Sequence, residues 1–174
     1  MKQRTLRVLS LCDGCSATSL ALRQLTKATG ILFEVTVVEW DEVWQSLVAV
    51  RFPEAVRGWS QDVVDWASPT FKPELFGDTF SFDLVIAGYP CQDLSSAFKA
   101  GQGLAGGRSS LFFDIWCVIC KLRRVNKEMD FVLECVDFEK KHKSDFALVS
   151  AITNVTPVKL CASMISACFR KRVF

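Results

Sequence analysis

Residues 6–25 read LRVLSLCDGCSATSLALRQL and contain a strand, a tight turn and the start of a helix. The apolar run Leu6–Leu11 has the length of a buried strand, and the leucine-rich segment that begins near Ser16 predicts a helix. The turn between them is acidic and contains Gly14, which permits a tight backbone conformation. A buried strand that leads through a short turn into a helix is the first unit of an α/β sheet.

The rest of the chain repeats this alternation. We expect further strands at Phe33–Val38, Val56–Trp66 (a short strand and turn), Phe82–Ala87, Met129–Leu133 and Val158–Ser163, helices at Val43–Val50, Leu111–Arg123 and Ser144–Thr153, and a surface connection over residues 69–79. The expected fold class is therefore α/β, with a doubly wound, mostly parallel sheet and helices on both faces. No linker or repeat interrupts the pattern, which indicates a single domain over residues 1–174.

The composition is that of a globular chain. Half of the 174 residues are hydrophobic and 23% are charged, which excludes disordered and low-complexity classes. No uncharged run is long enough for a membrane span and no signal peptide is evident, so we expect an intracellular protein of the nucleus or cytoplasm. The eight cysteines are then reduced thiols. Cys12/Cys15 and Cys117/Cys120 have zinc-knuckle spacing, but the pairs lie about a hundred residues apart, and we expect no metal site.

Charge is unevenly distributed along the chain. Residues 1–120 hold 10 basic and 13 acidic side chains, whereas residues 121–174 hold 11 and 6. A basic C-terminal third suits a polyanionic partner, although a solvated lysine-rich face explains part of the excess equally well.

The turn after the first strand is a candidate ligand site, because ligands of such sheets bind at the carboxyl ends of the strands. It contains Asp13, Gly14, Cys15 and Ser16. Free N–H groups at the N-terminus of the following helix face this turn. The Asp13 carboxylate would repel a pyrophosphate, so an amino-acid-like or nucleoside ligand suits the turn better. An ordinary turn between strand and helix is the alternative interpretation.

Acidic residues follow the next two strands. Glu39 comes at the end of the second strand, where a carboxylate can accept two ribose hydroxyls, and the adjacent Trp40 can stack on a purine. Asp62 can accept a hydrogen bond from an exocyclic amine. The alternative is that Glu39 and Asp62 are ordinary surface acids.

The Pro90-Cys91 turn after the fourth strand is the strongest chemical signal in the chain. A cysteine held in such a turn is exposed and conformationally fixed, as a nucleophilic thiol must be. A glycine-rich segment over residues 101–107 follows and is long enough to move. Glu134 lies at the corresponding end of the fifth strand and can face the same ligand. The alternative is a buried structural cysteine beside an unrelated acid.

Several short motifs resemble those of the DNA cytosine-C5 methyltransferases in both order and spacing. They are Asp13-Gly14, Glu39-Trp40, Asp62-Val63, Gly88-Tyr-Pro-Cys91, Arg108 to Phe113, Phe131-Val-Leu-Glu134 and Arg170-Lys-Arg172. Among the branches of that family, the chain looks most like the catalytic core of the eukaryotic de novo type. The resemblance covers essentially the whole chain, and it implies the Rossmann-like fold of S-adenosylmethionine-dependent methyltransferases.

The same resemblance implies roles for individual residues. Cys91 would add covalently to carbon 6 of cytosine, and Glu134 would hold the base at N3 and its amino group. Arg172, with Arg170 beside it, would support the cytosine oxygen and Glu134. The cofactor would be S-adenosylmethionine, with its methionine part at Asp13, Gly14, Cys15 and Ser16, its ribose at Glu39, its adenine at Trp40, Asp62 and Val63, and with Gly88 and Pro90 completing the cofactor site.

The resemblance also implies DNA as a partner, with the target base flipped out of the duplex. The chain stops at Phe174, before the target-recognition region and the final helix of the family. We therefore expect a C-terminally incomplete core whose open sheet edge is covered by a second subunit or a second copy, with no membrane partner. Phe112, Phe113 and Trp116 form either an association face or part of the core.

Two functions of different class remain open. The retained Cys91, Glu134, Arg170 and Arg172 favour a catalytic half-enzyme that methylates cytosine in DNA. The altered first motif, Cys15-Ser-Ala-Thr18, and the missing C-terminal third favour a catalytically inactive regulatory or scaffold subunit. RNA is a third, smaller alternative as substrate, because thiol addition works on RNA cytosine too.

Overall fold

The computed structural model describes residues 5–164 and 171–174, so Arg170 lies outside the described residues. The chain forms two compact units. The N-terminal unit contains residues 1–88 and 113–132, and the C-terminal unit contains residues 89–112 and 133–174.

The N-terminal unit is built on a sheet. Its strands are β1 (Thr5–Leu11), β2 (Leu32–Val38), β3 (Val56–Arg57), β4 (Leu84–Gly88) and the first half of β5 (Asp130–Val136), in the order β3-β2-β1-β4-β5. β1 pairs in parallel with β2 and β4, so that Leu11 lies opposite Val38 on one side and Ala87 on the other. The loops that follow these three strands therefore leave the sheet at the same edge.

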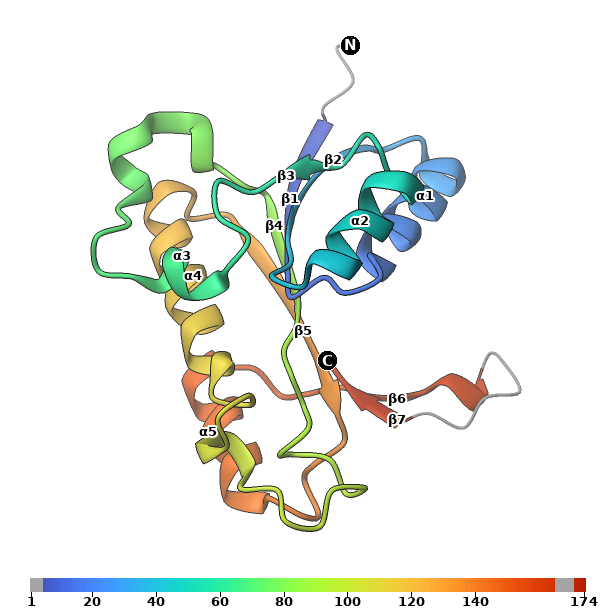
Figure 1. Ribbon diagram of the computed structural model, residues 1–174, viewed down its shortest axis with the longest axis vertical. Coiled ribbons are helices and arrows are strands. Elements are labelled where there is room, and N and C mark those ends of the chain that lie inside the picture. Colours follow the sequence, from blue (N-terminus) through green and yellow to red (C-terminus); the bar gives the residue numbers. More distant parts are fainter. Residues whose placement is uncertain (1–4, 165–170) are drawn as a thin grey trace. The chain divides into compact units, whose positions relative to one another are not determined.

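Helices cover both faces of this sheet (Figure 1). α1 (Ala17–Thr29) and α2 (Glu42–Arg51) lie on one side, and α3 (Val63–Ala67) and α4 (Leu111–Val125) lie on the other. The doubly wound α/β class predicted from the sequence is therefore confirmed.

Local sequence explains where these helices begin and end. Asp41 caps α2 by accepting N–H bonds from Val43 and Trp44. The helix α1 ends at Gly30, whose φ of 75° is a left-handed conformation that glycine adopts without steric cost.

The segment after α3 differs from its prediction as a plain surface connection. Pro73–Phe80 forms a 3-10 helix with a kink at Gly77. Proline at the first position of this helix costs no hydrogen bond, since that N–H has no helical partner. The Phe80 ring packs edge-on against Phe71 with ring centres 5.1 Å apart, so aromatic packing holds the segment in place.

The core between the sheet and the helices α1 and α2 is aliphatic. Buried side chains of Val8, Val35 and Val37 point from the strands, and Leu22 and Val48 meet them from the helices. Burying one such side chain stabilises a fold by roughly 1.5–3 kcal/mol.

The C-terminal unit adds antiparallel strands to the end of β5. Here β5 pairs with β7 (Lys171–Val173), and β7 pairs with β6 (Lys159–Cys161), so the full strand order is β3-β2-β1-β4-β5-β7-β6. The unit also holds α5 (Lys143–Thr153) and two 3-10 turns, Gly103–Ala105 and Ala162–Met164. The strand predicted at residues 158–163 is therefore shorter than expected, because a turn begins at Ala162. The sequence pattern does not predict β7, since three residues are too few to show alternation.

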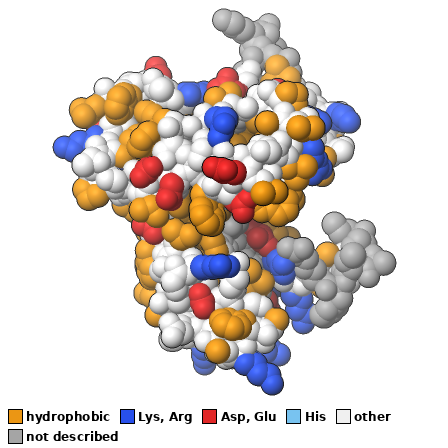
Figure 2. All heavy atoms as spheres, viewed as in Figure 1, with side chains coloured by type: hydrophobic (Ala, Val, Ile, Leu, Met, Phe, Trp, Pro, Cys, Tyr) orange, Lys and Arg blue, Asp and Glu red, His pale blue; other side chains and the backbone are white. Residues whose placement is uncertain are grey.

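Hydrophobic side chains are exposed at many places on the face shown in Figure 2. Trp40 and Val50 are 76% and 81% exposed. Phe112, however, is fully buried and packs against Tyr89, so it belongs to the core and not to an association face. Within the described ranges, no helix combines the length and the apolar composition that crossing a membrane requires.

Candidate active site

Cys91 lies in a fixed turn of the C-terminal unit, just after β4. Its carbonyl oxygen accepts hydrogen bonds from the N–H groups of Leu94 (3.1 Å) and Ser95 (2.8 Å). The side chain itself is half-buried. The Cys91 side chain is thus partly exposed in a turn whose backbone is held by two hydrogen bonds.

The surroundings of the Cys91 sulfur favour its thiolate form. Interaction with the Cys135 thiol is the main cause that favours the thiolate, and the Arg172 charge and the Val136 N–H act in the same direction. These contacts outweigh partial burial and the Glu134 charge, and they lower the pKa of Cys91 to about 6. At neutral pH the group is mostly thiolate.

Glu134 and Arg172 form an ion pair. The distance from Arg172 Nε to Glu134 Oε1 is 2.5 Å, and the side chains are 20% and 35% exposed for the arginine and the glutamate. Strand pairing explains the contact, because Val136 of β5 lies opposite Arg172 of β7. Three of the four predicted catalytic residues are thus gathered in the C-terminal unit, and the fourth, Arg170, lies outside the described residues.

Two further residues, Tyr89 and Cys135, belong to this cluster and were not predicted as site residues. Tyr89 is 4% exposed, and burial, followed by the neighbouring Cys135 thiol, raises the pKa of Tyr89. Cys135 is 1% exposed. Their positions in the sequence could have indicated them. Tyr89 lies between Gly88 and Pro90, and Cys135 follows Glu134.

The glycine-rich segment is docked within the C-terminal unit. The Asp145 carboxylate of α5 accepts the Leu104 N–H at 2.9 Å, and Lys141 Nζ donates to the carbonyls of Ser95 (2.9 Å) and Phe98 (2.6 Å). Gly103 sits against Asp145 with φ of 66°. The Asp145 contact anchors the segment over residues 101–107, which was predicted to be long enough to move, and Lys141 anchors the residues just before it.

Replacing Gly103 by alanine is expected to lower the free energy of unfolding by about 1–3 kcal/mol. A Cβ at this position would lie 2.0 Å from Asp145 Oδ2, so the carboxylate would have to leave the Leu104 N–H. Gly107→Ala is the matched control, because a Cβ there meets nothing within 4 Å. Urea unfolding of both variants measures the difference, and equal stabilities would contradict the docking role.

A second cluster, in the N-terminal unit, is acidic. Asp13, Glu39 and Asp62 come from the loops after three different elements, and all three act on the Cys12 thiol. Burial and then these charges raise the pKa of Cys12 to about 12. The edge of the sheet thus carries a negative potential that suits a cationic ligand.

The Glu39 side chain, which the sequence predicts as a ribose ligand, is buried. It is 5% exposed, and its two carboxylate oxygens accept the N–H groups of Gly14 (2.7 Å) and Asp41 (3.0 Å). The side chain therefore ties the first turn to the loop after β2. Each oxygen keeps a lone pair for a further donor, and the neighbouring Trp40 is 76% exposed and offers a free ring face.

The first turn leaves space beside its backbone. A Cβ built on Gly14, at φ of 55°, would meet nothing within 4 Å. Ser16 turns its hydroxyl inward to Ser19 Oγ at 2.7 Å and is fully buried, whereas Cys15 is exposed. Asp13 accepts from the Ser10 hydroxyl through one oxygen, and its other oxygen, Oδ2, has no partner among the described residues. The turn therefore has an unused acceptor next to open backbone.

The other predicted cofactor residues are Asp62, Val63, Gly88 and Pro90. Asp62 caps α3 by accepting the Val64 N–H at 2.9 Å. The Val63 side chain is 5% exposed and packs in the core. Gly88 is the last residue of β4, beside β1, and Pro90 precedes Cys91 in the C-terminal unit.

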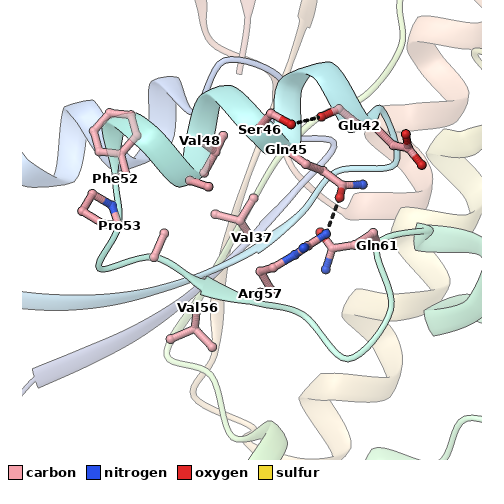
Figure 3. A pocket seen from close by; sticks show the side chains of 12 residues that line it. Val37, Glu42, Gln45, Ser46, Val48, Phe52, Pro53, Val56, Arg57 and Gln61 are labelled. Carbon is pink, nitrogen blue, oxygen red and sulfur yellow. Dashed lines mark hydrogen bonds between the residues drawn. The ribbon is translucent and has the colours of Figure 1, made fainter.

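A hollow of about 660 Å³ lies between α2 and the edge strand β3 (Figure 3). In it, Gln45 lies against Arg57 and hydrogen-bonds to it. The Gln45 amide also donates to the carbonyls of Glu39 (2.8 Å) and Trp40 (3.2 Å). The polar wall of this hollow therefore braces the loop that carries Glu39 and Trp40.

Solved structures show the class to which this fold belongs. A protein of Listeria monocytogenes described as a class I S-adenosylmethionine-dependent methyltransferase matches with a TM-score of 0.56 and 19% identity, over 99% of this chain and 53% of that one. The Entamoeba histolytica methyltransferase EhMeth matches with a TM-score of 0.52 and 15% identity, over 98% and 52%. At these identities the likeness defines the fold, which is that of S-adenosylmethionine-dependent methyltransferases.

The sequence itself defines the family. Residues 6–155 match the family model of the C-5 cytosine-specific DNA methylases, and the chain belongs to this family. The type II methyltransferase M.HaeII of Haemophilus aegyptius is 36% identical over 98 residues, which are 56% of this chain and 26% of that protein. The rice DNA (cytosine-5)-methyltransferase DRM1A is 31% identical over 124 residues, 69% and 25% of the two chains. The chain thus spans about a quarter of the length of these relatives.

Proposed function

We propose that this chain transfers a methyl group from S-adenosylmethionine to carbon 5 of cytosine in DNA. The observation that carries the proposal is the Cys91 sulfur, with its pKa lowered to about 6 by the Cys135 hydrogen bond and the Arg172 charge. A thiolate of this kind is the nucleophile that the reaction needs. The relatives M.HaeII and DRM1A are named as methyltransferases, which supports the same reaction here.

The reaction needs a covalent step because cytosine is a poor carbon nucleophile. The Cys91 thiolate adds to carbon 6, and the electron pair released into the ring makes carbon 5 nucleophilic. Glu134 then faces N3 and the exocyclic amino group, where charge changes during the addition. Arg172 holds the Glu134 carboxylate in place through its 2.5 Å ion pair. After methylation, loss of the carbon 5 proton expels the Cys91 thiolate.

The acidic cluster fits the proposed cofactor. S-adenosylmethionine, when bound, supplies an electrophilic methyl group, and it carries an ammonium and a sulfonium charge. Asp13 and Asp62 provide negative charge at the sheet edge, and Asp13 Oδ2 is an acceptor without a partner among the described residues. Trp40 offers a ring face for the adenine, and Glu39 accepts the ribose hydroxyls.

DNA is the proposed substrate, and its target base must leave the stack before Cys91 can reach it. We propose that recognition of the DNA target involves a second subunit or a second copy of this chain. The exposed hydrophobic side chains of the N-terminal unit, such as Val50 and Leu75, support such a partner.

Product analysis tests the proposed reaction. A cytosine-containing DNA duplex is incubated with the protein and S-adenosylmethionine, and its nucleosides are measured by mass spectrometry. The proposal expects 5-methylcytosine from the DNA and little from RNA of the same sequence. Cofactor binding without any methylated product, even with an added family member as partner, would favour the inactive regulatory subunit instead.

Replacing Glu39 by glutamine is expected to abolish stabilisation by the cofactor. S-adenosylmethionine at a hundred times its Kd should stabilise the native protein by about 2.7 kcal/mol. The variant loses an acceptor that holds both the Gly14 N–H and the ribose. Thermal unfolding with and without the cofactor measures this, and Glu42→Gln, an exposed acid on α2, is the control. An unchanged thermal shift in Glu39→Gln would place the cofactor elsewhere.

A further inference from the structure

One glutamine side chain holds the loop that carries Glu39 and Trp40. Gln45 lies in the first turn of α2, and its amide N–H groups donate to the carbonyls of Glu39 (2.8 Å) and Trp40 (3.2 Å). An amide nitrogen has two hydrogen atoms, so both bonds can form at the same time. The Gln45 amide therefore fixes the backbone of the two residues that we propose for the ribose and the adenine.

Arg57 of the edge strand β3 determines which way the Gln45 amide points. The Arg57 guanidinium donates a hydrogen bond to the Gln45 side-chain oxygen, and the two side chains meet in the hollow shown in Figure 3. A guanidinium has donors and no acceptor, so it pairs with the oxygen end of the amide. In the reversed orientation, the Gln45 oxygen would face two carbonyl oxygens and its NH2 group would face the Arg57 donors.

Glu39 has further contacts that hold it in place. Its N–H donates to the Gln61 side-chain oxygen (3.5 Å), and its carboxylate accepts the N–H groups of Gly14 (2.7 Å) and Asp41 (3.0 Å). The Trp40 ring, in contrast, is 76% exposed and gains little from packing. The position of the Trp40 ring therefore depends more strongly on the Gln45 bond than the position of the Glu39 carboxylate does.

We propose that Gln45, oriented by Arg57, is a positioning residue for the adenine end of the cofactor. Protein partners occupy its amide, so it acts through Trp40, whose ring it keeps where an adenine can stack. The inference rests on the proposed function, because it needs S-adenosylmethionine at the acidic cluster. It assigns a role to two residues that lie outside the sequence motifs.

The substitution Gln45→Glu separates this role from simple bracing of the hollow. A carboxylate of the same size still accepts from Arg57, but it cannot donate to the Glu39 and Trp40 carbonyls. We expect this variant to unfold near the temperature of the unchanged protein and to bind S-adenosylhomocysteine, the demethylated cofactor, about tenfold or more weakly by titration calorimetry. The added negative charge alone would favour the ligand's ammonium group, so weaker binding reports the lost donors.

Two further variants show which contacts matter. Ser46→Ala is the matched control, because the Ser46 hydroxyl lies in the same hollow and donates within α2 to the Glu42 carbonyl (2.8 Å). This variant should bind as the unchanged protein does. Arg57→Gln should weaken binding by about threefold, since the Gln45 amide loses the partner that orients it. The same substitution should have no further effect in Gln45→Ala, because it acts through that amide.

A double variant tests whether Gln45 acts through Trp40. Trp40→Ala should weaken binding of S-adenosylhomocysteine at least as much as Gln45→Glu, because the stacking surface is gone. Adding Gln45→Glu to Trp40→Ala should then cause little further loss, since there is no ring left to position. A general loss of structure would not show this dependence, because it would add to the effect of Trp40→Ala.

Two results would overturn the inference. One is equal affinity in Gln45→Glu and the unchanged protein, and the other is a loss of affinity that is just as large in the Trp40→Ala background. Circular dichroism shows whether each variant is folded, and Arg57→Gln replaces Gln45→Glu in these comparisons if the latter is not. A failure of the proposed function is seen separately, because the unchanged protein itself would then not bind S-adenosylhomocysteine, which refutes the cofactor site and this inference with it.

Discussion

Cys91→Ser is expected to lose DNA methylation by at least about a thousandfold while it keeps its affinity for S-adenosylmethionine. A serine hydroxyl is almost fully protonated at neutral pH, so it cannot add to carbon 6 as the Cys91 thiolate does. The acidic cluster that we propose for the cofactor lies in the N-terminal unit, and Cys91 lies in the C-terminal unit. The substitution should therefore separate catalysis from cofactor binding.

Covalent capture gives this prediction a second readout. DNA that contains 5-fluorocytosine cannot lose a proton from carbon 5, so the adduct with the thiol should persist after methyl transfer. We expect a DNA-linked protein band in the unchanged chain, with the attachment at Cys91, and no band in Cys91→Ser. Cys117→Ser is the control, since its thiol donates to the Ala67 carbonyl in the other unit. Methylation or capture that survives in Cys91→Ser would contradict the role of this residue.

The fold could be predicted largely from the sequence because its determinants are local. Leu6–Leu11 and Phe33–Val38 are long apolar runs followed by amphipathic segments, and both strands lie where expected. The antiparallel strand β7 could not be predicted, because its three residues depend on a partner, Cys135–Val136, far away in the chain. The helical turn at Pro73–Phe80 was also missed, since rings distant in sequence hold it.

The candidate site was predictable to the extent that its residues stand in motifs. Cys91, Glu134 and Arg172 were found in this way, and the structure pairs Glu134 with Arg172. What the sequence could not show is how neighbours change each group. The burial of Glu39 between two loops and the contact of Cys135 with Cys91 arise only when strands pair and loops close. Residues that tune a site through contacts thus remain hidden in a single sequence.

Cys135→Ala is expected to raise the pKa of Cys91 from about 6 toward the ordinary value of a thiol, because the Cys135 hydrogen bond is the main cause of the low value. The direction of the pH shift follows because only the thiolate form of Cys91 reacts. Below the pKa the thiol is protonated and unreactive, so a higher pKa moves the onset of reactivity to higher pH. At pH 7 the rate of alkylation of Cys91 should fall by about tenfold or more.

The pH profile of Cys91 alkylation measures this shift and separates it from a general loss of structure. Cys135→Ser should keep an inflection near that of the unchanged protein, because its hydroxyl also donates a hydrogen bond. Arg172→Gln should raise the pKa by a smaller amount, whereas Lys140→Gln, which removes an exposed charge in the same unit, should not. An alanine variant with an unshifted inflection would show that Cys135 does not tune Cys91. A shifted alanine variant that serine restores would establish the S–H donor as the group that activates the thiolate.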